Sequence, residues 1–85
     1  MGAAPRPVWV RGEITLGQLL KMAGVAETGG HAKELILDGA VTVNGQEERR
    51  RGRKLLPADI VRVGAVTLVV ERRSPEAGGR QHTPR

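Results

Sequence analysis

TGGHAKELILDGAVTVNGQEERRRGRK, residues 28–54, is the stretch of sequence that decides the fold. It contains a helical pattern opened by glycines, a glycine stop, a short alternating strand, an Asn-Gly turn and a basic run. Five of the fourteen basic residues lie in that run: Arg49, Arg50, Arg51, Arg53 and Lys54. The other nine balance the nine acidic residues, so the run accounts for the whole formal net charge of +5. Such a concentration of positive charge favours an anionic partner, above all a phosphate backbone.

Two short helices are expected in the first half of the chain. Thr15 and Gln18 have the spacing of a capping box, and apolar residues follow at helical intervals as far as Ala23. A second helix is expected to begin after Thr28 and to end at Gly39, where glycine suits a helix stop. Its buried stripe is predicted to consist of Ala32, Leu35 and Ile36.

Strands are expected on both sides of the helices. Residues 8–14 have the composition of a strand, and Val41–Val43 alternates before Asn44-Gly45, a strong tight-turn signal. Residues 46–53 contain no apolar residue and are expected to form an exposed loop or a sheet edge. A final hairpin is predicted from residues 60–63 and 66–70. The order β-α-α-β-loop-β-β describes a small α+β domain, in which two helices pack on an antiparallel or mixed sheet.

A single folded domain is expected over residues 8–72. The flanks, residues 1–7 and 73–85, are rich in Gly, Pro, Ala and Arg and have little to bury, so both are expected to be disordered. The second flank would form a basic tail. The chain has no cysteine, no apolar run of membrane-spanning length and no hydrophobic signal core, which favours a cytoplasmic protein without a membrane partner.

Sequence signals for catalysis are missing. Ser74 is the only serine and lies in a flank, and His31 and His82 are far apart. No His, Asp or Glu cluster has the spacing of a metal site. Gly29-Gly30 with Lys33 does not match the phosphate-binding loop of nucleotide hydrolases. We therefore expect no enzyme activity, no cofactor and no metal.

Aromatic residues are nearly absent. Trp9 is the only one and is interpreted as a packing residue. Domains that read single strands by stacking bases on rings need two or three exposed aromatic side chains. This composition argues against RRM, cold-shock and OB domains.

Two adjacent glycines, Gly29 and Gly30, fall in the first turn of the second expected helix. Each costs roughly 1 kcal/mol relative to alanine in a helix. Close packing between helices would explain them. So would a phosphate that approaches the bare N–H groups of the helix end.

The segments Thr28-Gly29-Gly30, Ala32-Lys33 and GAVTVNG, followed by the basic run, resemble the S-four type RNA-binding domain, named after an rRNA-binding protein of the small ribosomal subunit. The likeness covers residues 15–64 and extends in particular to short, stand-alone bacterial members of the YbcJ/YaaA kind. It implies an αL motif, two helices packed on a small sheet. It also implies a monomeric, non-catalytic protein that binds structured RNA, either rRNA or tRNA, and is associated with translation or with a ribosomal subunit.

In this family the N-terminal end of the second helix and the loop after the first hairpin strand form one basic surface. The resemblance carries RNA contact onto ten residues: Thr28, Gly29, Gly30, Lys33, Asn44, Arg49, Arg50, Arg51, Arg53 and Lys54. Many members have Ser-Arg where this chain has Thr28-Gly29. One helix-borne guanidinium is therefore absent here, and Lys33 is the residue expected to compensate in part.

Three other functions stay open at this point. Two short helices joined by a tight link are compatible with helix-turn-helix DNA binding, although Lys33 is the only basic residue of the second helix. A protein-interaction adaptor anchored on the ribosome is compatible with the same basic surface. A detached accessory domain of an RNA-modifying enzyme is the third, and its activity would need a partner.

Overall fold

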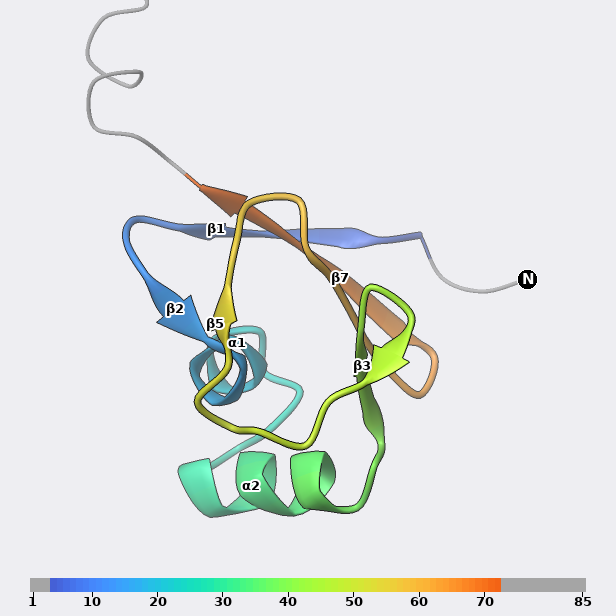
Figure 1. Ribbon diagram of the computed structural model, residues 1–85. Coiled ribbons are helices and arrows are strands. Elements are labelled where there is room, and N and C mark those ends of the chain that lie inside the picture. The colour runs from blue at the N-terminus through green and yellow to red at the C-terminus, as the bar shows by residue number, and fades with distance from the viewer. Residues whose placement is uncertain (1–3, 73–85) are drawn as a thin grey trace, which may run out of the picture.

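The computed structural model describes residues 4–72 of the 85-residue chain (Figure 1). The elements, in chain order, are β1 (Arg6–Val10), β2 (Ile14–Thr15), α1 (Leu16–Met22), α2 (Gly29–Leu37), β3 (Val41–Val43), β4 (Gln46–Glu47), β5 (Lys54–Leu55), β6 (Ile60–Val63) and β7 (Val66–Arg72). Two helices and short strands in this order confirm the expected α+β class.

The larger sheet has five strands in the order β1-β7-β6-β3-β4. Its strand pairs are antiparallel except for β1 and β7, which run parallel, so the sheet is mixed. β2 and β5 form a separate two-stranded sheet. Figure 1 shows both helices on the same side of the larger sheet, with α2 farthest from β1. The segment between β4 and β5 crosses the helices on this side.

The first strand differs from its expected position. The predicted strand over residues 8–14 is divided into β1 and β2, because β1 pairs with β7 only as far as Val10, which lies opposite Arg72. β1 also begins at Arg6, within the flank that was expected to be disordered. Main-chain pairing with β7 places Arg6 and Pro7 in the sheet, and an edge strand tolerates proline. Residues 73–85 lie outside the described residues, so the disordered basic tail stays a prediction.

Both helices begin and end where their capping residues predicted. Thr15 Oγ1 accepts a hydrogen bond from the Gln18 N–H, and Gln18 Oε1 accepts one from the Thr15 N–H, which completes the capping box of α1. Thr28 is the N-cap of α2. Gly39 follows the C-cap of α2 with φ of 79°, a left-handed conformation that favours glycine.

The hydrophobic core lies between the helices and the inner faces of the two sheets. In α2, Ala32 and Ile36 are buried, whereas Leu35 is half-buried. Trp9 is 50% exposed and does not belong to the buried core, whereas Val10 is the buried residue of β1; the interpretation of Trp9 as a packing residue stays a prediction. The buried apolar residues are Val10, Ile14, Leu16, Leu19, Leu20, Ala26, Ala32, Ile36, Val41, Val43, Leu55, Val61, Leu68 and Val70.

Candidate nucleic-acid interface

The basic run lies in residues 48–53, which we call the arginine loop, and extends into β5. Backbone hydrogen bonds attach this loop to the N-terminus of α1. The Leu16 N–H donates to the Arg53 carbonyl oxygen at 2.8 Å, and the Gly17 N–H donates to the Arg51 carbonyl oxygen at 3.0 Å. These donors have no partner inside their own helix. The loop therefore caps α1 and is held in a defined position relative to it.

One member of the arginine loop is a buried acid. Glu48 is only 6% exposed, and its carboxylate accepts hydrogen bonds from the Arg50 Nε at 3.0 Å and from the Arg53 Nη1 at 2.8 Å. The Arg50 backbone N–H also donates to it, at 3.1 Å. Hydrogen bonds from Arg50 and then Arg53 lower the pKa of Glu48 from 4.5 to about 2. Residues 46–53 were expected to form an exposed loop or a sheet edge. Gln46–Glu47 is the edge strand β4 and residues 49–52 are exposed, whereas Glu48 is buried, because four hydrogen bonds satisfy its carboxylate.

The first and last residues of the basic run, Arg49 and Lys54, also form ion pairs. Arg49 lies 3.4 Å from the Glu47 carboxylate and donates from its Nη1 to the Leu37 carbonyl oxygen at the end of α2, also at 3.4 Å. A cation at this end of a helix is favourable because the carbonyl groups there carry partial negative charge. Lys54 Nζ lies 3.5 Å from a carboxylate oxygen of Glu13.

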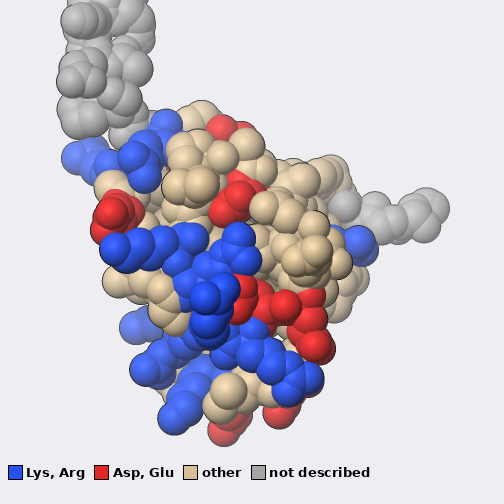
Figure 2. Space-filling model, viewed as in Figure 1, with Lys and Arg blue, Asp and Glu red and all other residues tan. Residues whose placement is uncertain are grey.

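The side chain of Arg51 differs from its neighbours. Arg49, Arg50, Arg53 and Lys54 form ion pairs, whereas Arg51 has none with any residue between 4 and 72. Figure 2 shows Lys and Arg side chains gathered in a band on the face where the arginine loop crosses the helices, with acidic side chains along one edge. The charge of the run is therefore partly offset by Glu13, Glu47 and Glu48, which the sequence count did not reveal.

The N-terminus of α2 is stabilised by its own side chains. Thr28 Oγ1 accepts from the His31 N–H at 3.0 Å, and His31 Nδ1 accepts from the Glu27 N–H at 3.2 Å. A methyl group added at Gly29 would meet no atom within 4 Å, and one added at Gly30 would meet only Thr28 Oγ1, at 3.8 Å. Close packing therefore does not explain the two glycines.

Two of the expected contact residues, Lys33 and Asn44, lie outside the arginine loop. Lys33 is exposed on α2. Asn44 is at the turn after β3, where its Nδ2 donates to Asp59 at 3.0 Å and its Oδ1 accepts from the Ile60 N–H at 2.9 Å. Its φ of 53° and that of Gly45, 87°, match the tight hairpin turn that the sequence predicted. The amide of Asn44 thus connects β3 to β6, and RNA contact by this residue stays a prediction.

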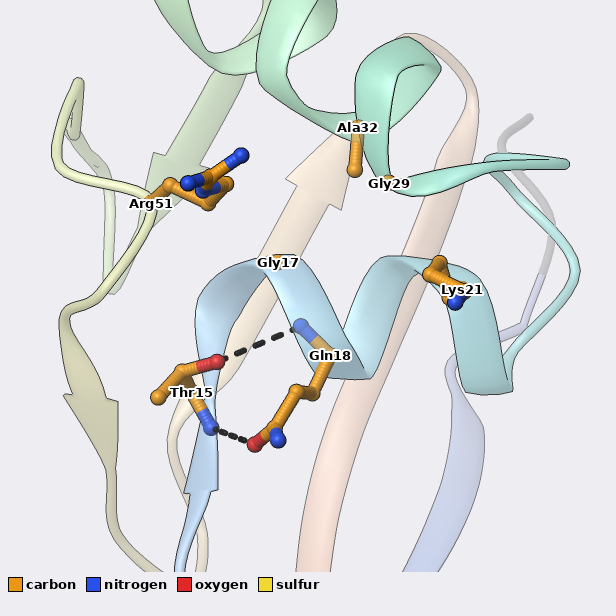
Figure 3. Close-up of a pocket in the computed structure, with 7 residues that line it drawn as sticks. All are labelled: Thr15, Gly17, Gln18, Lys21, Gly29, Ala32 and Arg51. Atoms are coloured by element: carbon orange, nitrogen blue, oxygen red, sulfur yellow. Dashed lines mark hydrogen bonds between the residues drawn. The ribbon is translucent and has the colours of Figure 1, made fainter.

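A surface pocket of about 200 Å³ lies between α1, the N-terminus of α2 and the arginine loop (Figure 3). It brings together two predicted site residues from distant parts of the sequence, Gly29 and Arg51. Its other lining residues, which sequence reasoning did not assign to a site, are Thr15, Gly17, Gln18, Lys21 and Ala32. The one available signal was Gly17, a glycine in the first turn of α1. A methyl group there would lie 2.6 Å from Arg51 Cγ.

The described residues offer little for other kinds of site. Among them, no group of three or more His, Asp or Glu side chains is arranged to hold a metal ion. Within residues 4–72, neither helix has the length and apolar character needed to cross a membrane.

The chain is similar to known proteins in both sequence and fold. The chain is 48% identical over 50 residues to a protein of Bacillus subtilis (strain 168) named "Probable ribosome maturation protein RlbA", an alignment that covers 59% of this chain and 70% of that protein. The 30S ribosomal protein S4e of Thermoplasma acidophilum shares the fold, with a TM-score of 0.50 and 17% identity. That match covers 65% of this chain but only 29% of the ribosomal protein. The model of the S4 domain matches residues 10–71. The resemblance noted in the sequence is thereby confirmed, and the chain belongs to the S4 domain family.

Proposed function

We propose that this protein is a non-catalytic RNA-binding protein that recognises structured RNA, rRNA or tRNA, and serves the ribosome or its maturation in the cytoplasm as a monomer. The observation that carries the proposal is the attachment of the arginine loop to α1. Arg51 and Arg53 accept hydrogen bonds from the first turn of this helix through their carbonyl oxygens. A cationic surface held in this way has a fixed shape, as recognition of a folded RNA requires.

The S4 family and the ribosome-maturation name of the Bacillus subtilis relative support the same function. The proposed contact surface consists of the arginine loop with Lys54 and the N-terminal end of α2. Arginine suits this task because its planar guanidinium makes two parallel hydrogen bonds to a phosphate. Because the chain has only one aromatic residue, we expect contacts to the RNA backbone and its shape to dominate over base stacking on rings.

The test measures binding of the full chain to a folded rRNA fragment by fluorescence anisotropy, at several KCl concentrations. The logarithm of the affinity should fall by about 0.7–0.9 per phosphate contact for each tenfold rise in salt. A duplex DNA of equal length serves as competitor and should displace the RNA poorly. An affinity that does not change with salt, or equal affinity for the DNA, contradicts the proposal.

A pair of matched variants tests the surface itself. Arg51→Ala should weaken RNA binding, whereas Arg62→Ala should not, because Arg62 is exposed on β6 outside the proposed surface. Both variants remove one arginine, so they change the net charge equally. Equal losses in the two variants would indicate that only the total charge matters.

Association with the ribosome is tested separately by sedimentation of cell extracts. We expect the protein to travel with a ribosomal subunit at low salt and to leave it as the salt concentration rises. Comigration that resists high salt would instead favour a protein-interaction adaptor.

A further inference from the structure

We infer that the pocket between α1, α2 and the arginine loop holds one unpaired nucleotide of the bound RNA, with its base inside the pocket and its phosphate at the cationic rim. This inference rests on the proposed function and names what that surface recognises. It predicts a preference for RNA helices interrupted by a bulged or unpaired residue over uniform helices.

The walls of the pocket suit a flat, uncharged group. Gly17 and Gly29 contribute only backbone, and Ala32 contributes a methyl group, so the part of the pocket between the two helices carries no charged side chain. In Figure 3 the amide of Gln18 is turned back toward Thr15, to which it is hydrogen-bonded. These walls offer a phosphate less than the ends of the pocket do, because the side-chain donors that suit it belong to Lys21 and Arg51. An unpaired base that has left the RNA helix can bury its flat faces against these walls.

The ends of the pocket carry positive charge. In Figure 3, Arg51 lies at one end and Lys21 at the other, with Gly17 between them on α1. Both side chains are exposed, and neither takes part in an ion pair with the described residues. A nucleotide whose base enters the pocket has its phosphate groups outside, where these two cations lie. The apolar walls fit the base of a nucleotide, and the cationic ends of the pocket fit its phosphate groups.

Arg51 is held in a position from which it can also contact the base. Its carbonyl oxygen accepts from the Gly17 N–H at 3.0 Å, and its aliphatic stem lies so close to Gly17 that a methyl group there would be 2.6 Å from Cγ. Its guanidinium points toward α2 in Figure 3. In RNA recognition, guanidinium planes act as stacking surfaces for unpaired bases in the same way as aromatic rings. Arg51 therefore supplies a planar stacking group in a domain with a single aromatic residue.

The two glycines of α2 provide a matched pair of variants. Gly29 lines the pocket and Gly30 does not, yet both are in the first turn of α2 and both have open space where a side chain would begin. Gly29→Leu should fill the pocket, and Gly30→Leu should place the same side chain outside it. Both substitutions favour the helix to a similar extent. Circular dichroism and the Tm confirm that each variant is folded.

The experiment compares one uniform RNA hairpin, with a stem of about 20 base pairs, with four hairpins of the same stem that each carry a single bulged nucleotide, one for each base. The bulge exposes one unstacked base. The wild-type protein should bind at least one bulged hairpin about tenfold more tightly than the uniform one. Gly29→Leu should lose this preference, whereas Gly30→Leu should keep it. Because both glycines belong to the proposed contact surface, the readout is the ratio of the affinities for the bulged and the uniform hairpin, and not either affinity alone.

Each outcome decides between the two proposals. Salt-sensitive binding without any preference for a bulge, or a preference that survives in Gly29→Leu, overturns the nucleotide pocket and leaves RNA binding standing. Absence of binding to every hairpin and to the rRNA fragment overturns both. A bulged 2-aminopurine gives a second measurement on the wild-type protein alone. Its fluorescence should rise on binding as the base leaves its neighbours, and an unchanged signal contradicts base insertion.

Discussion

The side-chain stem of Arg51 lies against the bare Cα of Gly17, and the Gly17 N–H donates to the carbonyl oxygen of the same arginine at 3.0 Å. The absence of a side chain at Gly17 is what allows the arginine loop to cross α1 at this distance. Gly17 is buried, although it belongs to the first turn of a helix. A glycine in α1 thus determines the position of a cation more than thirty residues later in the chain.

Gly17→Ala should weaken RNA binding while leaving the domain folded. The added methyl group would lie 2.6 Å from Arg51 Cγ and must displace that side chain. Alanine is also favoured over glycine in a helix by about 1 kcal/mol, which offsets part of the cost of the clash. We expect the affinity for RNA to fall by about three- to tenfold, measured by anisotropy, with a small change in Tm.

Gly30→Ala is the control for this variant. It makes the same change in the first turn of the other helix, where only an ordinary contact of 3.8 Å with Thr28 Oγ1 is created. This methyl group does not touch Arg51, so any loss of RNA affinity should be smaller than the loss in Gly17→Ala. A similar loss in both variants would show that the position of Arg51 is not responsible.

Arg53→Ala and Arg51→Ala should separate stability from binding. Arg53 donates to buried Glu48 at 2.8 Å, so its removal leaves a carboxylate oxygen without this partner and should lower the Tm by several degrees. Arg51 is exposed and forms no ion pair with the described residues, so Arg51→Ala should leave the Tm unchanged and reduce RNA affinity. Equal Tm values for the two variants would contradict the structural role of Arg53.

Glu48→Gln should reduce stability at neutral pH and have less effect in acid. The hydrogen bonds from Arg50 and Arg53 lower the pKa of Glu48 from 4.5 to about 2 in the folded protein. A carboxyl group with a lowered folded-state pKa contributes stability above its unfolded-state pKa, and this contribution is lost as the pH falls toward the folded-state value. The difference in unfolding free energy between wild type and Glu48→Gln should therefore shrink between pH 4.5 and about 2. Urea unfolding followed by circular dichroism measures it.

Glu13→Gln is the matched control for the acid experiment. Its carboxylate pairs with Lys54 at 3.5 Å, but both side chains are largely exposed, and exposed ion pairs contribute little to stability. This variant should unfold as the wild type does across the same pH range. A difference in unfolding free energy between wild type and Glu48→Gln that stays constant from pH 4.5 to about 2 would show that the carboxylate is not held by the two arginines.

Ala58→Gly should stabilise the domain. Ala58 follows Pro57 in a turn closed by a hydrogen bond from the Asp59 N–H to the Leu56 carbonyl oxygen at 3.0 Å, and it has φ of 75°. This left-handed conformation costs a residue with a side chain roughly 1–2 kcal/mol, and glycine avoids that cost. The substitution also increases the conformational entropy of the unfolded chain, which cancels part of the gain. We expect the unfolding free energy to rise by up to about 1 kcal/mol.

The control for this prediction is another exposed alanine in a tight turn. In the turn between β6 and β7 the positive φ belongs to Gly64, 60°, and not to Ala65. Ala65→Gly should therefore leave stability unchanged or lower it slightly, since glycine adds only chain entropy there. A gain in both variants would point to an effect unrelated to the conformation of Ala58.

The features that the sequence predicted are local ones. The capping box of Thr15 and Gln18, the N-cap at Thr28 and the turn at Asn44-Gly45 each depend on interactions within a few residues. Their signals are hydrogen-bonding groups and glycines at fixed spacing, which do not need the rest of the chain. The boundaries of α1 and α2 were accordingly close to those observed.

The features that the sequence did not reveal join distant segments. Nothing in an unbroken polar stretch identifies Glu48 as the buried acid and Glu47 as the exposed one, because the two are adjacent and identical in chemistry. The contact between Gly17 and Arg51 likewise depends on the path of the arginine loop over α1. For the same reason Lys21 was not recognised as a neighbour of Gly29, which belongs to another helix.

The parallel pairing of β1 with β7 has a consequence for biosynthesis. Among the strands of residues 4–72, β1 is synthesised before the others, and its register places Arg6 opposite Leu68 and Val10 opposite Arg72. Its neighbour in this sheet, β7, is the last of these strands to be synthesised. The helices and the β3–β6–β7 antiparallel strands can assemble from contacts that are closer in sequence, whereas contacts between chain ends form slowly. The domain can therefore pair β1 only after β7 has been synthesised, and a truncation that removes β7 would leave β1 without its partner in the sheet and expose the edge of β6.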